Sequence, residues 1–200
     1  MPSPKTRNDP FFRVSALLSR ILLSPVYGLR AEGTENLPNR GGFVLLPKHQ
    51  RWQDIPILAL STPKPLYFVA KHELFANPFI GSTLKALGGI PLNRSRPLES
   101  RASLEAVVKL LGEGERIVVF PEGTYHRNRM GPGRIGMVRH LLSRGRSPFI
   151  PVGINYDQKG VRTRVRVCFG RPVISSPSDL APDFLDRMMV EIAGLSGLTS

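Results

Sequence analysis

Residues 117–124 read Ile-Val-Val-Phe-Pro-Glu-Gly-Thr, a run of four apolar residues that ends at a proline and is followed by a carboxylate. Four β-branched or aromatic residues bounded in this way predict a buried strand. A second apolar run, Phe43-Val44-Leu45-Leu46, leads through a proline into Lys48-His49-Gln50-Arg51-Trp52-Gln53-Asp54. In open α/β sheets, ligands bind beyond the carboxyl ends of the strands. The polar residues after these two strands are therefore where a functional site is expected.

Segments typical of strands and helices alternate along the rest of the chain. Short apolar runs and apolar alternation predict further strands at 66–69, 90–92, 149–154 and 161–167. Apolar residues at helical spacing predict helices at 52–60, 98–111, 134–143 and 179–193. Residues 31–42 are expected to be rich in turns, and the strand at 161–167, where valine alternates with arginine, is expected at a half-exposed sheet edge. The order predicts an α/β fold with a mixed, mainly parallel sheet flanked by helices.

Composition describes a single domain with a strongly basic surface. The 200 residues are 41% hydrophobic, which suffices for one core, and the formal net charge is +13. Between Arg127 and Arg171, eleven basic residues face one acid, Asp157. Such a surface attracts anions, including nucleic acid, phospholipid headgroups and acidic proteins. The single cysteine, Cys168, excludes an internal disulfide and a cysteine zinc cluster and favours a reducing compartment, and no phosphate-binding P-loop motif occurs.

The N-terminal segment, residues 1–24, predicts an amphipathic helix. Its apolar stripe is formed by Phe11, Val14, Leu17, Leu18, Ile21 and Leu22. The segment is too short, and too interrupted by Arg13 and Arg20, to span a bilayer, and it does not fit a signal peptide. Two interpretations remain open: the stripe packs on the core, or it lies in a membrane interface where its arginines meet anionic lipid.

His49 and Asp54 form a candidate catalytic dyad. On one straight helix, two residues five apart would point about 140° away from each other, at 100° per residue. They can meet only if His49 lies in the loop and Asp54 in the first turn of the following helix. Asp54 would then accept a hydrogen bond from Nδ1 and leave Nε2 as a general base. The spacing alone is a weak signal, whereas Phe-Pro-Glu-Gly-Thr at 120–124 is far more specific.

Four segments in order resemble the blocks of the glycerolipid acyltransferase family, which includes the 1-acylglycerol-3-phosphate acyltransferases. They are H-x4-D at His49 and Asp54, an arginine after an apolar run at Arg94, F-P-E-G-T at Phe120–Thr124, and the apolar segment around Pro151. The blocks lie within residues 40–155, so the resemblance implies a single acyltransferase domain over residues 1–200.

The resemblance implies transfer of a fatty acyl group from acyl-CoA or acyl carrier protein to a hydroxyl of lysophosphatidic acid or a related lysophospholipid, in phospholipid biosynthesis. His49 would be the general base, and Asp54 would hold its tautomer and stabilise the imidazolium. Acceptor binding would fall to Arg94, Glu122, Gly123 and Thr124. No metal, cofactor or covalent acyl-enzyme is implied. The protein is expected in the cytoplasm, peripherally attached to the cytoplasmic face of the membrane.

Two departures from the family pattern bear on the acceptor. The first block usually has Asn and Ser where this chain has Lys48 and Arg51. The third usually continues with Arg, whereas Tyr125 and His126 intervene here before Arg127, the candidate substitute. Two alternative functions remain open at this point. A catalytically inactive lipid-binding relative would share the motifs. A basic nucleic-acid-binding module would explain the charge but neither motif, and the basic run has no interleaved aromatic residues for base stacking.

Overall fold

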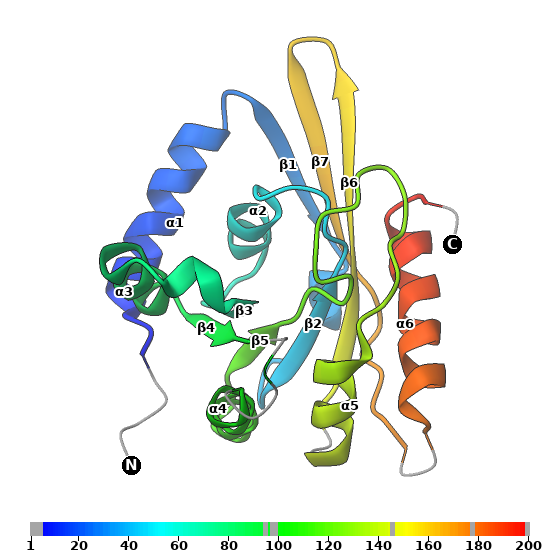
Figure 1. Ribbon diagram of the computed structural model, residues 1–200. Coiled ribbons are helices and arrows are strands. Elements are labelled where there is room, and N and C mark those ends of the chain that lie inside the picture. The colour runs from blue at the N-terminus through cyan, green and yellow to red at the C-terminus, as the bar shows by residue number, and fades with distance from the viewer. Residues whose placement is uncertain (1–5, 94–95, 97–99, 145–146, 177–178, 199–200) are drawn as a thin grey trace.

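Helices cover both faces of a seven-stranded sheet (Figure 1). The structure is a computed structural model that describes residues 6–93, 96, 100–144, 147–176 and 179–198. The strands are β1 (Tyr27–Glu32), β2 (Phe43–Pro47), β3 (Tyr67–Lys71), β4 (Gly89–Leu92), β5 (Arg116–Val118), β6 (Phe149–Lys159) and β7 (Arg162–Phe169). The helices are α1 (Asp9–Leu23), α2 (Asp54–Ser61), α3 (Pro78–Ala86), α4 (Arg101–Gly112), α5 (Ile135–Arg144) and α6 (Ala181–Leu195), with 3-10 turns η1 (Thr34–Asn36) and η2 (His72–Phe75).

The strand order is β1-β7-β6-β2-β5-β3-β4. Every neighbouring pair is parallel except β6 and β7, which form an antiparallel hairpin. β2 therefore lies between β5 and β6, and the carboxyl ends of these three strands meet at one edge of the sheet. The expected α/β fold with a mixed, mainly parallel sheet is confirmed, and the topology places the residues after β2 and β5 side by side.

The core consists of two apolar layers, one on each face of the sheet. Because successive side chains of a strand point to opposite faces, β2 sends Val44 and Leu46 to one layer and Phe43 and Leu45 to the other. The first layer packs against α4, α5 and α6, and the second against α1 and α2 (Figure 1). Buried on both faces, β2 reads as a continuous apolar run, as expected of a central parallel strand.

One expectation from the sequence was wrong, and two segments were missed. The turn-rich stretch expected at 31–42 is found from residue 33 onward, but 31–32 belong to β1, whose residues 27–32 pair with β7. β7 is consequently not an edge strand, although its valines do face the core and its arginines solvent. The segment 72–86, for which no element was expected, holds η2 and α3. In each case, pairing or packing with a distant segment outweighs a weak local pattern.

Helix α1 contacts the rest of the protein through a narrow face. Asn8 caps it by accepting from the backbone N–H of Phe11, and Phe12 is its buried residue. The predicted apolar stripe points outward instead, from Phe11 at 41% exposure to Leu22 at 74%. The interpretation in which this stripe packs on the core is therefore wrong. Across the described parts of the chain, no helix is long and apolar enough to cross a bilayer.

Candidate active site

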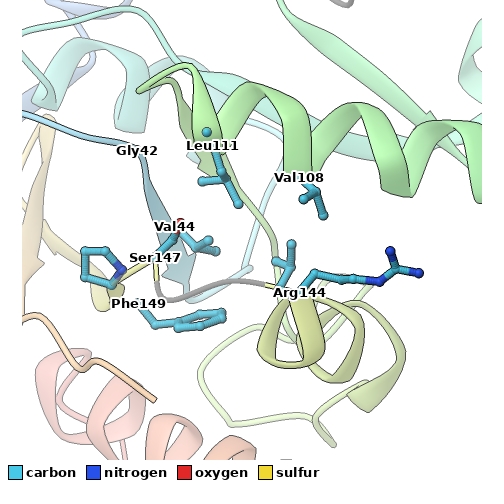
Figure 2. Close-up of a pocket in the computed structure, with 10 residues that line it drawn as sticks. Gly42, Val44, Val108, Leu111, Arg144, Ser147 and Phe149 are labelled. Carbon is cyan, nitrogen blue, oxygen red and sulfur yellow. The ribbon is translucent and has the colours of Figure 1, made fainter. Parts of the chain in front are cut away.

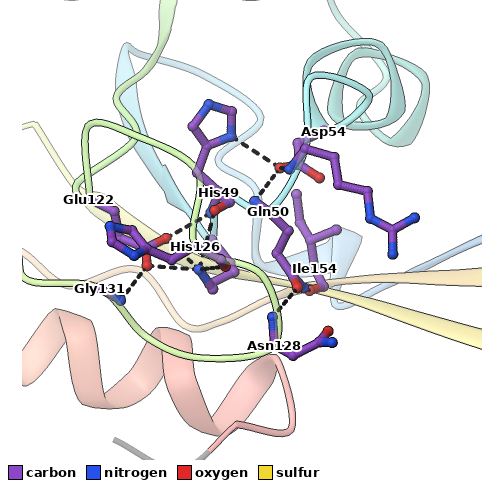
Figure 3. A network of polar contacts seen from close by, with 10 residues as sticks. His49, Gln50, Asp54, Glu122, His126, Asn128, Gly131 and Ile154 are labelled. Atoms are coloured by element: carbon purple, nitrogen blue, oxygen red, sulfur yellow. Dashed lines mark hydrogen bonds and ion pairs between the residues drawn. The ribbon is translucent and has the colours of Figure 1, made fainter.

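His49 and Asp54 meet just beyond the carboxyl end of β2. His49 lies in the loop after the strand, and Asp54 is the first residue of α2. Nδ1 of His49 is 3.0 Å from Oδ2 of Asp54, the arrangement that the five-residue spacing requires (Figure 3). Asp54 is fully buried and His49 is 8% exposed. The pair therefore has the geometry of a general base oriented by a carboxylate.

Asp54 is held by the loop that precedes it and by β6. Its Oδ2 accepts from the backbone N–H groups of Gln50 at 2.6 Å and Arg51 at 2.8 Å. Its Oδ1 accepts from the hydroxyl of Tyr156 at 2.5 Å. Hydrogen bonds to the charged form of a buried carboxylate compensate for its lost hydration. Asp54 is therefore fixed as a hydrogen-bond acceptor facing His49.

The imidazole of His49 lies between two aromatic rings. Phe120 stacks on it with ring centroids 3.7 Å apart, and Tyr125 meets it edge-on at 4.4 Å. Both rings belong to the segment after β5 that contains Phe-Pro-Glu-Gly-Thr. Within the part of the chain that the structure describes, Nε2 has no hydrogen-bonding partner. That nitrogen is the atom available to a substrate.

Glu122 lies next to the backbone of His49 (Figure 3). It forms a buried ion pair with Lys48. Its carboxylate accepts from Lys48 Nζ at 2.7 and 2.6 Å, from the His49 N–H at 3.0 Å and from the Gly131 N–H at 2.6 Å. Glu122 is 1% exposed and Lys48 is 0% exposed. Both oxygens of Glu122 are thus engaged by the protein, and its contact with the acceptor stays a prediction. Glu122 braces the loop that carries His49.

Lys48 joins the two loops of the site. Besides Glu122, its ammonium group donates to the backbone carbonyls of His126 at 2.7 Å and His49 at 3.2 Å. Burial lowers the pKa of Lys48, and the Glu122 carboxylate opposes that shift. The sequence marked Lys48 only as a departure from the family pattern. Its role depends on a partner 74 residues away, which no local signal could reveal.

Gln50 adds a second connection between these segments. Its side-chain carbonyl accepts from the Asn128 N–H at 2.9 Å, and its amide donates to the Ile154 carbonyl at 2.7 Å. The His126 N–H also donates to the His49 carbonyl at 2.9 Å. Residues 122–131 are thereby attached to the loop after β2 and to β6. No pattern in the sequence indicates this role for Gln50.

Gly123, Thr124 and Arg127, three of the remaining predicted site residues, lie on the same loop. Gly123 has φ of +70°, a conformation that favours glycine, and Thr124 and Arg127 are exposed. Arg94 lies outside the described residues. The structure thus brings His49, Asp54 and Glu122 together and places Gly123, Thr124 and Arg127 on the loop that follows.

Two cavities lie away from the dyad. One, of about 370 Å³, opens at the amino ends of β2 and β6, where Val108 and Leu111 of α4 face Phe149 with Arg144 of α5 at its side (Figure 2). The other, of about 400 Å³, lies between α1, α2 and β1 and is bordered by Arg20, Tyr27 and Arg162. Among the described residues, no cluster of His, Cys, Asp and Glu could hold a metal ion.

Comparison with known sequences connects this geometry to one family. Residues 28–155 match the family model described as Acyltransferase. The 1-acyl-sn-glycerol-3-phosphate acyltransferase of Bacillus subtilis (strain 168) is 30% identical over 167 residues, which are 81% of this chain and 82% of that protein. The chloroplastic 1-acyl-sn-glycerol-3-phosphate acyltransferase LPAT1 of Arabidopsis thaliana is 34% identical over 134 residues, 64% of this chain and 36% of its own length.

Two further matches concern the acceptor and the fold. The lyso-ornithine lipid O-acyltransferase of Rhizobium meliloti (strain 1021) is 30% identical over 97 residues, 48% of this chain and 32% of that protein. The crystal structure of the 1-acyl-sn-glycerophosphate acyltransferase PlsC from Thermotoga maritima superimposes with a TM-score of 0.65. The superposition covers 96% of this chain and 79% of that chain at 24% identity, so it shows a shared fold.

Proposed function

Because this chain belongs to the acyltransferase family and is an acyltransferase, we propose that it transfers a fatty acyl group from a thioester to the free hydroxyl of a lysophospholipid. The proposed acceptor is 1-acyl-sn-glycerol-3-phosphate, which the name of the Bacillus relative specifies for that protein. The proposed donor is acyl-CoA or acyl carrier protein. The observation that carries the proposal is the 3.0 Å contact between His49 and Asp54, with Nε2 of His49 directed away from it.

In the proposed reaction, Nε2 of His49 removes the proton from the acceptor hydroxyl as the oxygen attacks the thioester carbonyl. Asp54 keeps the proton on Nδ1, so that Nε2 is the basic nitrogen, and stabilises the imidazolium that forms. The tetrahedral intermediate then collapses, the carbon–sulfur bond breaks, and the imidazolium returns the proton to the leaving thiolate. The products are an ester and a free thiol, and the dyad is restored without a covalent acyl-enzyme.

Lys48 and Glu122 are proposed to serve this reaction by fixing the backbone at His49. We assign recognition of the acceptor phosphate to Arg94 and Arg127, because the guanidinium group of arginine is suited to phosphate. Arg127 is also exposed on the loop next to the dyad. Tyr125, which stands where the family usually has an arginine, contacts the imidazole of His49 edge-on. We propose that an arginine further along the loop replaces the usual phosphate ligand.

Peripheral attachment to a membrane is proposed to bring the site to its lipid acceptor. The exposed stripe of α1 supplies apolar side chains for insertion, with Leu17 at 59%, Ile21 at 60% and Leu22 at 74% exposure. Basic residues on the same protein would add about 1 kcal/mol each near an anionic leaflet. The site then faces a surface where lysophospholipid is concentrated.

The test is an acyl-transfer assay on the purified protein with both CoA and carrier-protein thioesters. The acceptor panel contains 1-acyl-sn-glycerol-3-phosphate, lysophosphatidylethanolamine, glycerol 3-phosphate and lyso-ornithine lipid, the last because one relative carries that name. The proposal expects the highest kcat/KM with 1-acyl-sn-glycerol-3-phosphate. Preference for lyso-ornithine lipid would refute the proposed acceptor. Absence of transfer with every combination of donor and acceptor would indicate that this protein is a catalytically inactive member of the family.

A further inference from the structure

Strand β6 continues past the end of its neighbour β2, and this extension contacts Asp54 through Tyr156. Pairing of β2 with β6 ends at Pro47 and Val152, whereas β6 continues to Lys159. Tyr156 lies four residues beyond the last pair and two beyond Ile154, which belongs to the core layer beneath α1 and α2. Since alternate residues of a strand share a face, the ring of Tyr156 points to the side of the sheet where α2 begins. Its hydroxyl reaches Asp54 Oδ1 at 2.5 Å.

The ring of Tyr156 is fixed on both sides by other elements. Tyr27 of β1 packs edge-on against it with ring centroids 6.3 Å apart, and the guanidinium carbon of Arg51 lies 4.3 Å from its centroid. Burial raises the pKa of Tyr156, and the charge of Asp54 and their hydrogen bond raise it further. The phenol therefore remains a neutral hydrogen-bond donor throughout the working pH range.

The two oxygens of Asp54 have different partners. Oδ2 faces His49 and accepts two backbone N–H groups, so its position is set by the loop. Oδ1 is bound by Tyr156. A carboxylate with only one oxygen held can rotate about the bond to its side chain, whereas a donor on each oxygen fixes its plane. The hydrogen bond from the phenol also reduces the negative charge on the carboxylate. Asp54 therefore stabilises the protonated imidazole of His49 less than it would without the phenol.

We propose that Tyr156 is a positioning residue for the acyl transfer, acting through Asp54 to orient the His49 imidazole and to set how readily it gains and loses a proton. The inference rests on the proposed function, because it requires His49 to be the general base. Tyr156 itself need not touch either substrate. The motif blocks do not include it, and its contact with Asp54 spans 102 residues of sequence.

Other charged and titratable groups surround the dyad, and the test must separate Tyr156 from them. The groups next to His49, Asp54 or Tyr156 on the neighbouring segments are Lys48, Arg51, Glu122, Tyr125, His126 and Tyr27. All of them remain unchanged when only the hydroxyl of Tyr156 is altered. Tyr27→Phe is a matched control, since it removes a phenol hydroxyl that accepts from Gln53 at 3.4 Å and keeps the ring packed on Tyr156.

The experiment measures kcat, KM and the pH profile of kcat/KM for the full chain with Tyr156→Phe. We expect kcat to fall roughly tenfold, the scale seen when an outer hydrogen-bond partner of a functional group is removed, with KM nearly unchanged. Without the phenol, Asp54 holds the imidazolium more tightly, so the acidic limb of the profile moves to higher pH. Difluorotyrosine at position 156 is a stronger donor and should move the same limb to lower pH. Tyr27→Phe should leave the limb in place.

A structural role would lower activity without these opposite shifts. A limb that stays in place in both Tyr156 variants, or moves the same way in both, would overturn the inference. In an Asp54→Asn background, Tyr156→Phe should add no further loss of kcat, and a second tenfold loss would likewise overturn it. Full activity of His49→Ala would instead refute the proposed mechanism as a whole. If His49→Ala loses activity but the acidic limb of the pH profile does not move in Tyr156→Phe, only the role of Tyr156 is refuted.

Discussion

Replacing Glu122 by Gln should destabilise the protein severely, because it leaves the Lys48 ammonium buried without a counter-charge. At the 2.6 Å separation of Lys48 Nζ and Glu122 Oε2, the attraction is about 6 kcal/mol at an effective dielectric constant of about 20. Removing both groups from water opposes much of this attraction. Deleting one partner of such a pair typically costs about 3–5 kcal/mol. We therefore expect a loss of about 3 kcal/mol or more in the free energy of unfolding.

Urea unfolding at neutral pH measures this loss, with circular dichroism as the probe. The double variant Lys48→Met, Glu122→Gln removes both charges, and it should be more stable than Glu122→Gln alone because no buried charge is left without a counter-charge. Glu73→Gln is the matched control, since Glu73 pairs with Lys71 at the surface with side-chain exposures of 48% and 65%. It should change stability by no more than about 1 kcal/mol. A Glu122→Gln variant as stable as Glu73→Gln would refute the buried-pair reasoning.

Three further predictions concern the acceptor, the membrane and pH. Arg94→Ala and Arg127→Ala should each raise the acceptor KM more than the donor KM, as measured by varying each substrate, because a lost charge-assisted phosphate contact is worth about 1.5–3 kcal/mol. The double variant Leu18→Asp, Ile21→Asp should bind anionic vesicles at least tenfold more weakly in sedimentation assays, and its binding should be more sensitive to salt. The reason is that burying each such apolar side chain contributes about 1.5–3 kcal/mol. The pKa of Tyr156 is higher in the folded protein than in the unfolded chain. The free energy of unfolding should therefore fall above pH ~10, by up to about 1.4 kcal/mol per pH unit. Tyr156→Phe should reduce this slope in unfolding measurements.

The features predicted correctly from sequence are those that a short segment determines. Phe43–Leu46 is apolar at every position because β2 is buried on both faces, so its pattern is strong. The dyad geometry followed from helical periodicity, which permits only one placement for residues five apart. The fold class followed from the alternation of such segments, and all of these elements were found.

The features that sequence reasoning missed depend on partners far along the chain. β1 has no clear alternation, and it is a strand because it pairs with β7 more than 130 residues later. Tyr156 and Lys48 each look unremarkable locally, since a tyrosine in a strand and a lysine in a loop are common. Their roles arise because the sheet brings β6 and the loop after β5 next to β2. The sequence motif singled out Glu122, but only its buried contacts indicate that it supports the loop.

The most direct test of the central claim is the rate of acyl transfer to 1-acyl-sn-glycerol-3-phosphate by purified His49→Ala beside the unaltered protein. We expect a kcat lower by about 10²–10⁴-fold, because a general base is removed. His49 packs between Phe120 and Tyr125, so folding is checked by circular dichroism on the same sample. A folded His49→Ala protein that transfers acyl groups at the rate of the unaltered protein would show that His49 is not the general base.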